Sequence, residues 1–299
     1  MGSMLASMTP WTHRTWVVTC MPSSNLVCAF IMPALPPELE YLIVELALRN
    51  KSPDSATRTA LSTVARRFSI WADEIWDEVV HETILIDSSH TANSFLENVK
   101  GGTLHPKVVK FLCITYGVPS EKAASIAEMC TEVKALAMWA ICRESTTLFA
   151  ALSHLHLSLL SIELSQLKLI PPVSNWLQVR RLDLVLFQDP EVHDFVSTLG
   201  RLPALTHLCF LMDQATEPHI VGVLDACPTL QVVVVLVHTQ YEWRLPFAVD
   251  ERVVVLPNVN GVLKEWHAKV DGEQNVWTTA EEVIAERRKA PEAFSNSTP

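Results

Sequence analysis

Val179-Arg180-Arg181-Leu182-Asp183-Leu184 follows an apolar-x-x-apolar-x-apolar pattern that returns along most of the chain. Copies of the pattern begin at positions 109, 133, 157, 179, 205 and 230, so the spacings are 24, 24, 22, 26 and 25 residues. A period of roughly 20–29 residues is typical of solenoids with one strand in each repeat. A single short strand cannot bury its apolar edge alone, so neighbouring repeats must stack. The sequence therefore predicts an α/β fold with one long parallel sheet, a geometry that suits the binding of another protein.

The segments between the repeated strands space their apolar residues as helices do. We expect helices over 119–132, 191–199 and 217–227, each with a proline near its start. These helices would cover one face of the sheet in a solenoid of residues 91–258. After the last repeat, Thr279 begins a helix over 279–289, which we expect to cap the open end of the core. The segment 259–299 is thus predicted to hold a capping helix and a disordered tail.

The chain before the repeats divides into two parts. Residues 1–33 are rich in Met, Ser, Thr and Pro and have no regular periodicity, so we expect a disordered extension there. A helical module of residues 34–90 follows. Its first helix has an apolar stripe of Leu39, Leu42, Ile43 and Leu46. The second places Ala60, Leu61, Val64 and Phe68 on one face, and a third covers 70–80. Three short helices make a small core, so their stripes are expected to serve a partner or the solenoid as well.

Two segments of this module carry a family resemblance. They are Leu35-Pro36-Pro37-Glu38-Leu39 with Ile43-Val44, and Leu61-Ser62-Thr63-Val64-Ala65-Arg66-Arg67-Phe68, followed by a Trp-rich turn into Glu82-Thr83-Ile84-Leu85-Ile86. The order resembles F-box-like proteins with leucine-rich repeats, which are abundant in mushroom-forming (basidiomycete) fungi. F-boxes open with Leu-Pro-x-Glu-(Ile/Leu) and continue to a Val-Cys-(Lys/Arg)-x-Trp-like element. The resemblance implies a three-helix F-box-like module before a curved leucine-rich-repeat-like solenoid with a parallel sheet on one face and helices on the other.

The function implied by this resemblance is that of a non-enzymatic adaptor. An F-box docks on a Skp-type adaptor and through it on a cullin, while the solenoid captures a target protein for a ubiquitin ligase whose chemistry belongs to other subunits. Such a chain acts in the cytoplasm or the nucleus. The resemblance places the Skp-type adaptor contact, or its supporting core, at Leu35, Pro36, Leu39, Ile43, Leu61, Val64 and Phe68.

The sequence also departs from the F-box pattern. The linker over 48–59 is longer than the usual turn between the helices, and Ala65 and Phe68 stand where Cys and Trp are common. Either departure is consistent with weakened adaptor binding. Three alternatives therefore stay open: a plain three-helix cap on the solenoid, a stand-alone interaction scaffold with a decayed F-box, and an enzyme built on the repeat face.

Strand alternation predicts which side chains a target would meet. Successive side chains point to opposite faces of a sheet, so Arg181 and Asp183 point outward if Leu182 and Leu184 point inward. The same register turns residues of the other repeats outward, and among these Trp and Arg are the types most enriched at binding hot spots. The candidate target-binding residues are Trp139, Glu163, Arg181, Asp183 and His207.

Composition argues against nucleic acid and membranes as partners. The net charge of −10 opposes a phosphate backbone, and the one basic cluster, 287–289, fits the solvated face of a helix better than a nuclear-import signal. The apolar runs near the N-terminus are shorter than the roughly 20 residues of a membrane span. Ala6 departs from the myristoylation pattern that Gly2 suggests.

Motifs for catalysis and cofactors are missing from the sequence. Neither glycine-rich nucleotide motif occurs, nor a Gly-x-Ser-x-Gly elbow, and we expect no cofactor. The seven cysteines form no CxxC pair and fit free buried thiols. His154 and His156 have no further metal ligands at the usual spacing. Cys209 beside His207 is the one arrangement that suggests a nucleophile, and a packing role is the preferred interpretation.

Overall fold

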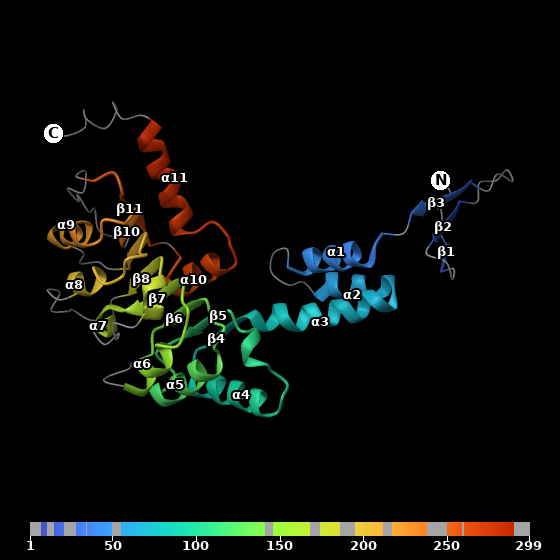
Figure 1. Ribbon diagram of the computed structural model, residues 1–299, viewed down its shortest axis with the longest axis horizontal. Helices are drawn as coiled ribbons and strands as arrows, with labels where there is room; N and C mark the ends of the chain where they lie inside the picture. The colour runs from blue at the N-terminus through green and yellow to red at the C-terminus, as the bar shows by residue number, and fades with distance from the viewer. Residues whose placement is uncertain are drawn as a thin grey trace. The chain divides into compact units, whose positions relative to one another are not determined.

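The computed structural model of the chain describes residues 7–10, 15–20, 28–33, 35–49, 55–140, 146–167, 174–185, 195–211, 217–237, 250–258 and 260–289. The chain divides into two compact units, Met1–Val79 and Val80–Pro299. The first contains three helices and the second contains strands that alternate with helices, as the elements in Figure 1 show.

Three helices in contact form the core of the first unit. They are α1 (Pro37–Arg49), α2 (Ser55–Val64) and α3 (Arg66–Glu82). Val44 and Leu48 of α1 pack with Ala72 and Ile75 of α3. This bears out the predicted helical module, although the third helix is longer than expected at both ends and runs past Val79. Most of the predicted linker is helical too, because α1 continues to Arg49 and α2 already begins at Ser55.

The second predicted helix is interrupted, which corrects one detail of the sequence analysis. Helix α2 ends at Val64, Ala65 is not helical, and Phe68 therefore belongs to α3. Two hydroxyl groups near the break donate to carbonyls of their own helix: Ser62 Oγ to Arg58 O at 2.9 Å and Thr63 Oγ1 to Ala60 O at 2.7 Å. Such back-bonding competes with the regular helical hydrogen bonds and often bends or ends a helix.

Three short strands lie in the segment for which the sequence predicts a disordered extension. They are β1 (Ser7–Pro10), β2 (Thr15–Cys20) and β3 (Cys28–Pro33), in an antiparallel sheet of order β1-β2-β3. Residues with high strand propensity, such as Val17, Val18 and Ile31, stand within β2 and β3. The difference from the expectation is that this segment has regular backbone pairing.

The second unit is built on one parallel sheet in which every strand lies beside its neighbours in sequence. The order is β11-β10-β9-β8-β7-β6-β5-β4. The strands are β4 (Thr83–Ile86), β5 (Phe111–Ile114), β6 (Ala135–Met138), β7 (Leu159–Glu163), β8 (Arg181–Val185), β9 (His207–Leu211), β10 (Val232–Val237) and β11 (Val253–Pro257). This is a leucine-rich-repeat-like arrangement. Its first strand, β4, lies before residue 91, so the sheet begins earlier in the chain than the predicted solenoid of residues 91–258.

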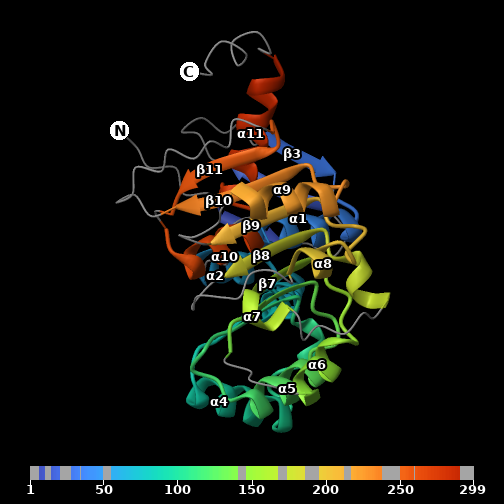
Figure 2. The ribbon, with the colours of Figure 1, turned by 90° about the vertical axis from the view of Figure 1, so that its left-hand side faces the viewer.

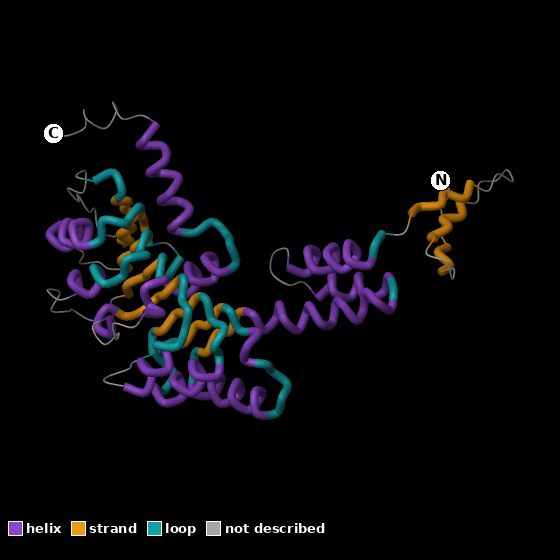
Figure 3. The backbone as a smooth tube through the Cα atoms, viewed as in Figure 1, coloured by secondary structure: helices purple, strands orange, loops and turns teal. Residues whose placement is uncertain are grey.

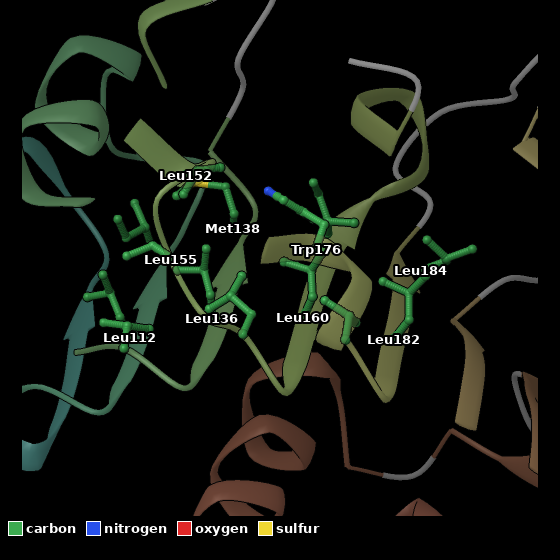
Figure 4. Packing of buried hydrophobic residues seen from close by; sticks show 14 of the residues in the cluster. Leu112, Leu136, Met138, Leu152, Leu155, Leu160, Trp176, Leu182 and Leu184 are labelled. Atoms are coloured by element: carbon green, nitrogen blue, oxygen red, sulfur yellow. The ribbon is translucent and has the colours of Figure 1, made fainter. Parts of the chain in front are cut away.

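The register of the sheet follows the repeated pattern. One row of paired positions runs across the strands through Leu112, Leu136, Leu160, Leu182, Leu208 and Val233. Figure 4 shows four of these leucines side by side on successive strands. The row confirms that the six copies of the pattern are stacked repeats, because each residue of the row pairs with the equivalent residue of the next copy.

Short helices cover one face of this sheet, as the tube in Figure 3 and the turned view in Figure 2 show. They are α4 (Ser89–Lys100), α5 (Ser120–Met129), α6 (Thr146–Leu152), α7 (Leu164–Leu167), α8 (Phe195–Leu199) and α9 (Glu217–Ala226), with the 3-10 turns η1 (Pro106–Val108) and η2 (Ser174–Gln178). The inward side chains of the strands and these helices form the main core. Three of these helices match those expected from spacing, while 191–194 lie outside the described residues.

Two C-terminal helices lie on the opposite face. They are α10 (Val262–Val270) and α11 (Val276–Lys289), and their buried residues form a second cluster with the outward side chains of the strands. The sequence predicts one helix at the open end of the core, starting at Thr279. The structure instead has two helices on the face of the sheet, and Asn275 starts the second because its side-chain oxygen accepts from the backbone N of Trp277 at 2.9 Å.

Candidate functional site

An exposed apolar stripe on α1 is the first candidate surface. The buried side of α1 consists of Glu40, Val44 and Leu48, spaced four residues apart, and not of the apolar residues that periodicity singled out. Those residues are 45–60% exposed, as is the leucine that precedes the helix: Leu35, Leu39, Leu42, Ile43 and Leu46. A row of large exposed apolar side chains on one helix is typical of a surface that a partner covers.

Contacts to α3 explain why α1 turns this stripe outward. The Glu40 carboxylate is almost fully buried and accepts from Arg67 Nη2 at 2.6 Å. At the other end of the helix, Arg49 Nη2 donates to Glu78 Oε2 at 3.0 Å. Val44 packs between these ion pairs in the small core with Ile75. The polar and apolar contacts together define the rotation of α1, so its remaining apolar side faces away from the bundle.

The structure separates the seven residues that the F-box resemblance singled out. Leu35, Pro36, Leu39 and Ile43 are exposed on or before α1, and Val64 is 55% exposed at the end of α2. Leu61 and Phe68 are half-buried and pack against the core of the unit. Five residues are thus free for contact, and two support the helices. The resemblance did not single out Leu42, Leu46 or Ile70, which are also exposed and apolar.

The outward face of the sheet is the second candidate surface. The predicted alternation is confirmed, because inward and outward residues belong to different clusters: Leu182 and Leu184 lie in the main core, whereas Ala137 and Cys209 lie in the second cluster. The outward row is nevertheless buried, since α10 and α11 cover it. Trp266, Trp277 and Ile284 of these helices are 1–4% exposed in contact with the strands.

Three of the five candidate target-binding residues come together beneath α10 and α11. Asp183 Oδ2 lies 2.7 Å from Lys269 Nζ of α10, and the two side chains are 3% and 2% exposed. His207 Nε2 lies 2.8 Å from Glu281 Oε1 of α11. Arg181 is 44% exposed, with Nη2 3.8 Å from the same Glu281 oxygen. Each of these sheet residues thus has a charged partner from a C-terminal helix.

The other two candidates lie nearer the amino-terminal end of the sheet. Trp139 follows β6 and is 4% exposed, and its Nε1 donates to Ser161 Oγ of β7 at 3.0 Å. Glu163, the last residue of β7, is half-buried, with Oε2 3.3 Å from Gln166 Nε2. Trp139 therefore fills space and satisfies a buried hydroxyl. Its role and that of Glu163 in target binding stay predictions.

The charges in this contact are unevenly balanced. Lys269 lies beside two buried carboxylates, Asp183 and Glu265, and Asp183 Oδ1 has no hydrogen-bond partner among the described residues. Burial raises the pKa of Asp183, the Lys269 ammonium opposes that shift, and Glu265 adds to it. Glu265 accepts from Asn260 Nδ2 at 2.8 Å and from the backbone N of Val276 at 3.3 Å. The buried group therefore carries a net negative charge when both carboxylates are ionised.

His207, beneath the helices, is held by three neighbours, Thr206, Trp277 and Glu281. Its Nδ1 lies 2.8 Å from Thr206 Oγ1, and its ring meets the edge of Trp277 at 5.5 Å between centroids. Because the Glu281 carboxylate only accepts, it fixes the tautomer with the proton on Nε2. Burial lowers the pKa of His207, while the hydrogen bond to Glu281 opposes that shift.

The Cys209 and His207 pair does not form a nucleophilic site. Both side chains point to the outward face, as expected, but Cys209 is fully buried, and burial raises the pKa of its thiol far above its usual range. A protonated thiol is a poor nucleophile. The Nε2 of His207 is occupied by Glu281. The geometry therefore favours the packing role.

The described residues lack the features of a metal site and of a membrane span. In the parts of the chain that the structure describes, which include His154 and His156, no three His, Cys, Asp or Glu side chains gather as metal ligands would. Within the same ranges, every helix is too short or too polar to cross a bilayer.

The residues that sequence reasoning missed are those of the C-terminal helices. Lys269, Glu265 and Glu281 interact with candidate residues that stand 74 to 100 positions earlier in the chain, and no local pattern connects them. Trp266 and Trp277 were the one available signal, since two tryptophans in a short polar segment indicate an apolar contact.

Comparison of the chain with protein-family models and with curated proteins found no match. The sequence motifs and the geometry described above therefore carry the functional argument.

Proposed function

We propose that the chain is the target-binding adaptor of a Skp–cullin–F-box ubiquitin ligase. In this proposal α1 and the end of α2 dock on a Skp-type adaptor, which connects the chain to a cullin, and the leucine-rich-repeat-like sheet carries the surface for a target protein. The chain itself performs no chemistry, and it acts in the cytoplasm or the nucleus. The order of a short helical module before a repeat sheet supports the proposal, as does the resemblance of the Leu-Pro-rich stretch to an F-box.

The observation that carries the proposal is the exposed stripe on α1. Burial of one large apolar side chain contributes roughly 1.5–3 kcal/mol, so a partner that covers several members of the stripe gains substantial affinity. A small bundle needs most of its apolar side chains for its own core, yet Leu39, Ile43 and Leu46 are about half exposed or more. Their exposure is consistent with a docking surface on this helix.

The test is a direct binding measurement with purified protein. Intact chain is titrated with a Skp-type adaptor by calorimetry, alongside the variants Leu39→Asp and Ile43→Asp. Each variant replaces a docking side chain by a charge that has no partner in the complex, and we expect a loss of affinity of about tenfold to a hundredfold, equal to about 1.4–2.8 kcal/mol. Leu177→Asp is the matched control, because Leu177 is 43% exposed in the other unit and is expected to change nothing.

The alternative is a stand-alone interaction scaffold with a decayed F-box. The departures from the F-box pattern at Ala65 and Phe68 favour it. The intact chain then fails to bind the adaptor at micromolar concentrations, and Leu39→Asp makes no difference. That result would remove the ligase proposal and leave a scaffold whose stripe serves another partner.

A further inference from the structure

Residues 260–289, which we name the C-terminal cover, occupy the face of the sheet that alternation assigns to a target. The cover consists of α10, a turn and α11, and its large side chains Trp266, Trp277 and Ile284 pack on the outward residues of the strands. In its presence Asp183 and His207 are less than 10% exposed. A target cannot reach these residues while the cover is in place.

The cover contacts the sheet as a bound partner would. Its one buried cation, Lys269, pairs with Asp183, and its Glu281 reaches both His207 and Arg181. Lys269 also stands over the ring of Trp277, with Nζ 5.0 Å from the centroid. Asp183, His207 and Arg181 are thus each met by an opposite charge or an acceptor of the cover, and aromatic side chains surround them.

The attachment of the cover is made by side chains. Among the described residues, the backbone hydrogen bonds of 260–289 all have their partners inside the cover, so no strand or ladder connects it to the sheet. Arg287 donates from its side chain to the carbonyl of Val253 at 2.6 Å. The chain enters the cover at Gly261, whose φ of 72° only glycine adopts readily. The cover can therefore leave without breaking the sheet's own hydrogen bonds.

The contact also holds buried polar atoms that lack a partner. Within the described residues these include Asp183 Oδ1, Trp266 Nε1 and Trp277 Nε1, all in the contact between cover and sheet. Each such atom destabilises the closed form, whereas water can hydrate it once the cover opens. Beside the larger apolar core on the opposite face, the described residues hold two such atoms, Trp176 Nε1 of η2 and Gln166 Oε1 of α7. Opening is thus expected first at the cover.

We propose that the C-terminal cover is an autoinhibitory pseudo-target, displaced by a target helix that presents a basic side chain to Asp183 and aromatic side chains to the surrounding apolar face. We infer the partner's chemistry from the cover, because Lys269, Trp266 and Trp277 are the side chains that the cover places on this face of the sheet. That the displacing helix belongs to a ligase target rests on the proposed function. The opening of the cover is independent of that function, since it is a property of the free chain.

Native-state hydrogen exchange on the intact chain tests the opening. Lys269→Met keeps the apolar stem but leaves two buried carboxylates without their cation, so the amides of α10 and α11 are expected to exchange at least tenfold faster while those of β7, β8 and β9 keep their rates. Lys264→Met is the matched control on the same helix, because Lys264 is exposed and its ammonium donates to Asn260 within the cover itself. If the strands accelerate as much as the cover, or if nothing accelerates, the cover is an integral part of the fold and the proposal is wrong.

A second measurement covers the case in which Lys269→Met does not fold. A specific protease site is inserted after Asn258 in the otherwise natural chain, and the cleaved protein is offered a fluorescent peptide of residues 260–289. We expect the peptide to exchange into the cleaved chain saturably, and its Lys269→Glu form to bind at least tenfold more weakly. Precipitation after cleavage, or equal binding by both peptides, overturns the proposal.

These results are independent of the ligase proposal. Adaptor binding is measured on α1, in the other unit, and the Lys269→Met chain is expected to bind the adaptor as the unaltered chain does. Failure of the unaltered chain to bind an adaptor removes the proposed ligase role and leaves the opening of the cover to be decided by exchange alone.

Discussion

Replacement of the buried ion pair by apolar side chains is expected to cost less than removal of either charge. Asp183 and Lys269 are 3% and 2% exposed, with 2.7 Å between Oδ2 and Nζ, and no group in the described part of the chain donates to Asp183 Oδ1. A pair in this setting gains Coulomb energy but loses the hydration of both ions. The single change Lys269→Met leaves Asp183 and Glu265 buried without the cation that pairs with Asp183, so we expect the free energy of opening of the cover to fall by about 3–5 kcal/mol.

Asp183→Leu is expected to cost less than Lys269→Met. Glu265 stands four residues before Lys269 on α10 and remains as a counter-charge when Asp183 is gone. The double variant Asp183→Leu, Lys269→Met removes both charges of the pair and leaves Glu265, which keeps its hydrogen bonds to Asn260 and Val276. Its free energy of opening should lie within about 1 kcal/mol of the unaltered chain, or above it.

The assay is amide exchange in α10 and α11 on all four proteins, since exchange reports the free energy of opening of this segment directly. The two mutations are coupled if the double variant loses far less than the sum of the single losses. A double variant that loses the full sum would refute the reasoning, because it would mean that the two side chains stabilise the cover independently and not as a desolvated pair.

Three other predictions concern the sheet. Leu182→Ala in the central row should lower the free energy of unfolding by about 2–5 kcal/mol in urea denaturation, whereas Leu177→Ala, at an exposed site, should stay within about 0.5 kcal/mol; equal effects would contradict the stacked row. The lowered pKa of His207 means that the unfolded chain binds its proton more readily, so the free energy of unfolding should fall as pH drops below about 6.5, and His207→Gln should flatten that slope in urea titrations. Burial raises the pKa of Cys113 to about 12 and that of Cys209 further, so neither should react with a thiol reagent near pH 8 until the chain unfolds; rapid labelling in the native chain, seen by mass spectrometry, would contradict their burial.

The stacking of the repeats was readable from the sequence because it depends on local information. A strand's side chains alternate by geometry, and an identical position in each copy finds the same neighbour when the copies stack. Leu112, Leu160 and Leu208 therefore lie in one row of paired positions across the sheet, as expected. Even the division between inward and outward residues, such as Leu182 and Asp183, followed from this period alone.

The sequence predicted the apolar stripe of α1, but it could not predict how the helix is rotated about its own axis. Periodicity shows that Leu39, Leu42, Ile43 and Leu46 share a side of the helix, but it cannot say whether that side meets the bundle or a partner. The ion pair between Glu40 and Arg67 and the packing of Val44 decided the matter, and both depend on where α3 lies. The exposed stripe is thus a tertiary result.

The covering of the sheet face was decided only in three dimensions. Asp183 and Lys269 stand 86 positions apart, and each alone has the spacing of an ordinary surface charge. Periodicity describes how a segment presents its side chains, while the choice of which segment covers another depends on apolar area and charge matched across the whole chain. The sequence therefore specified the face and its residues, and the folded chain specified that its own C-terminal helices occupy it.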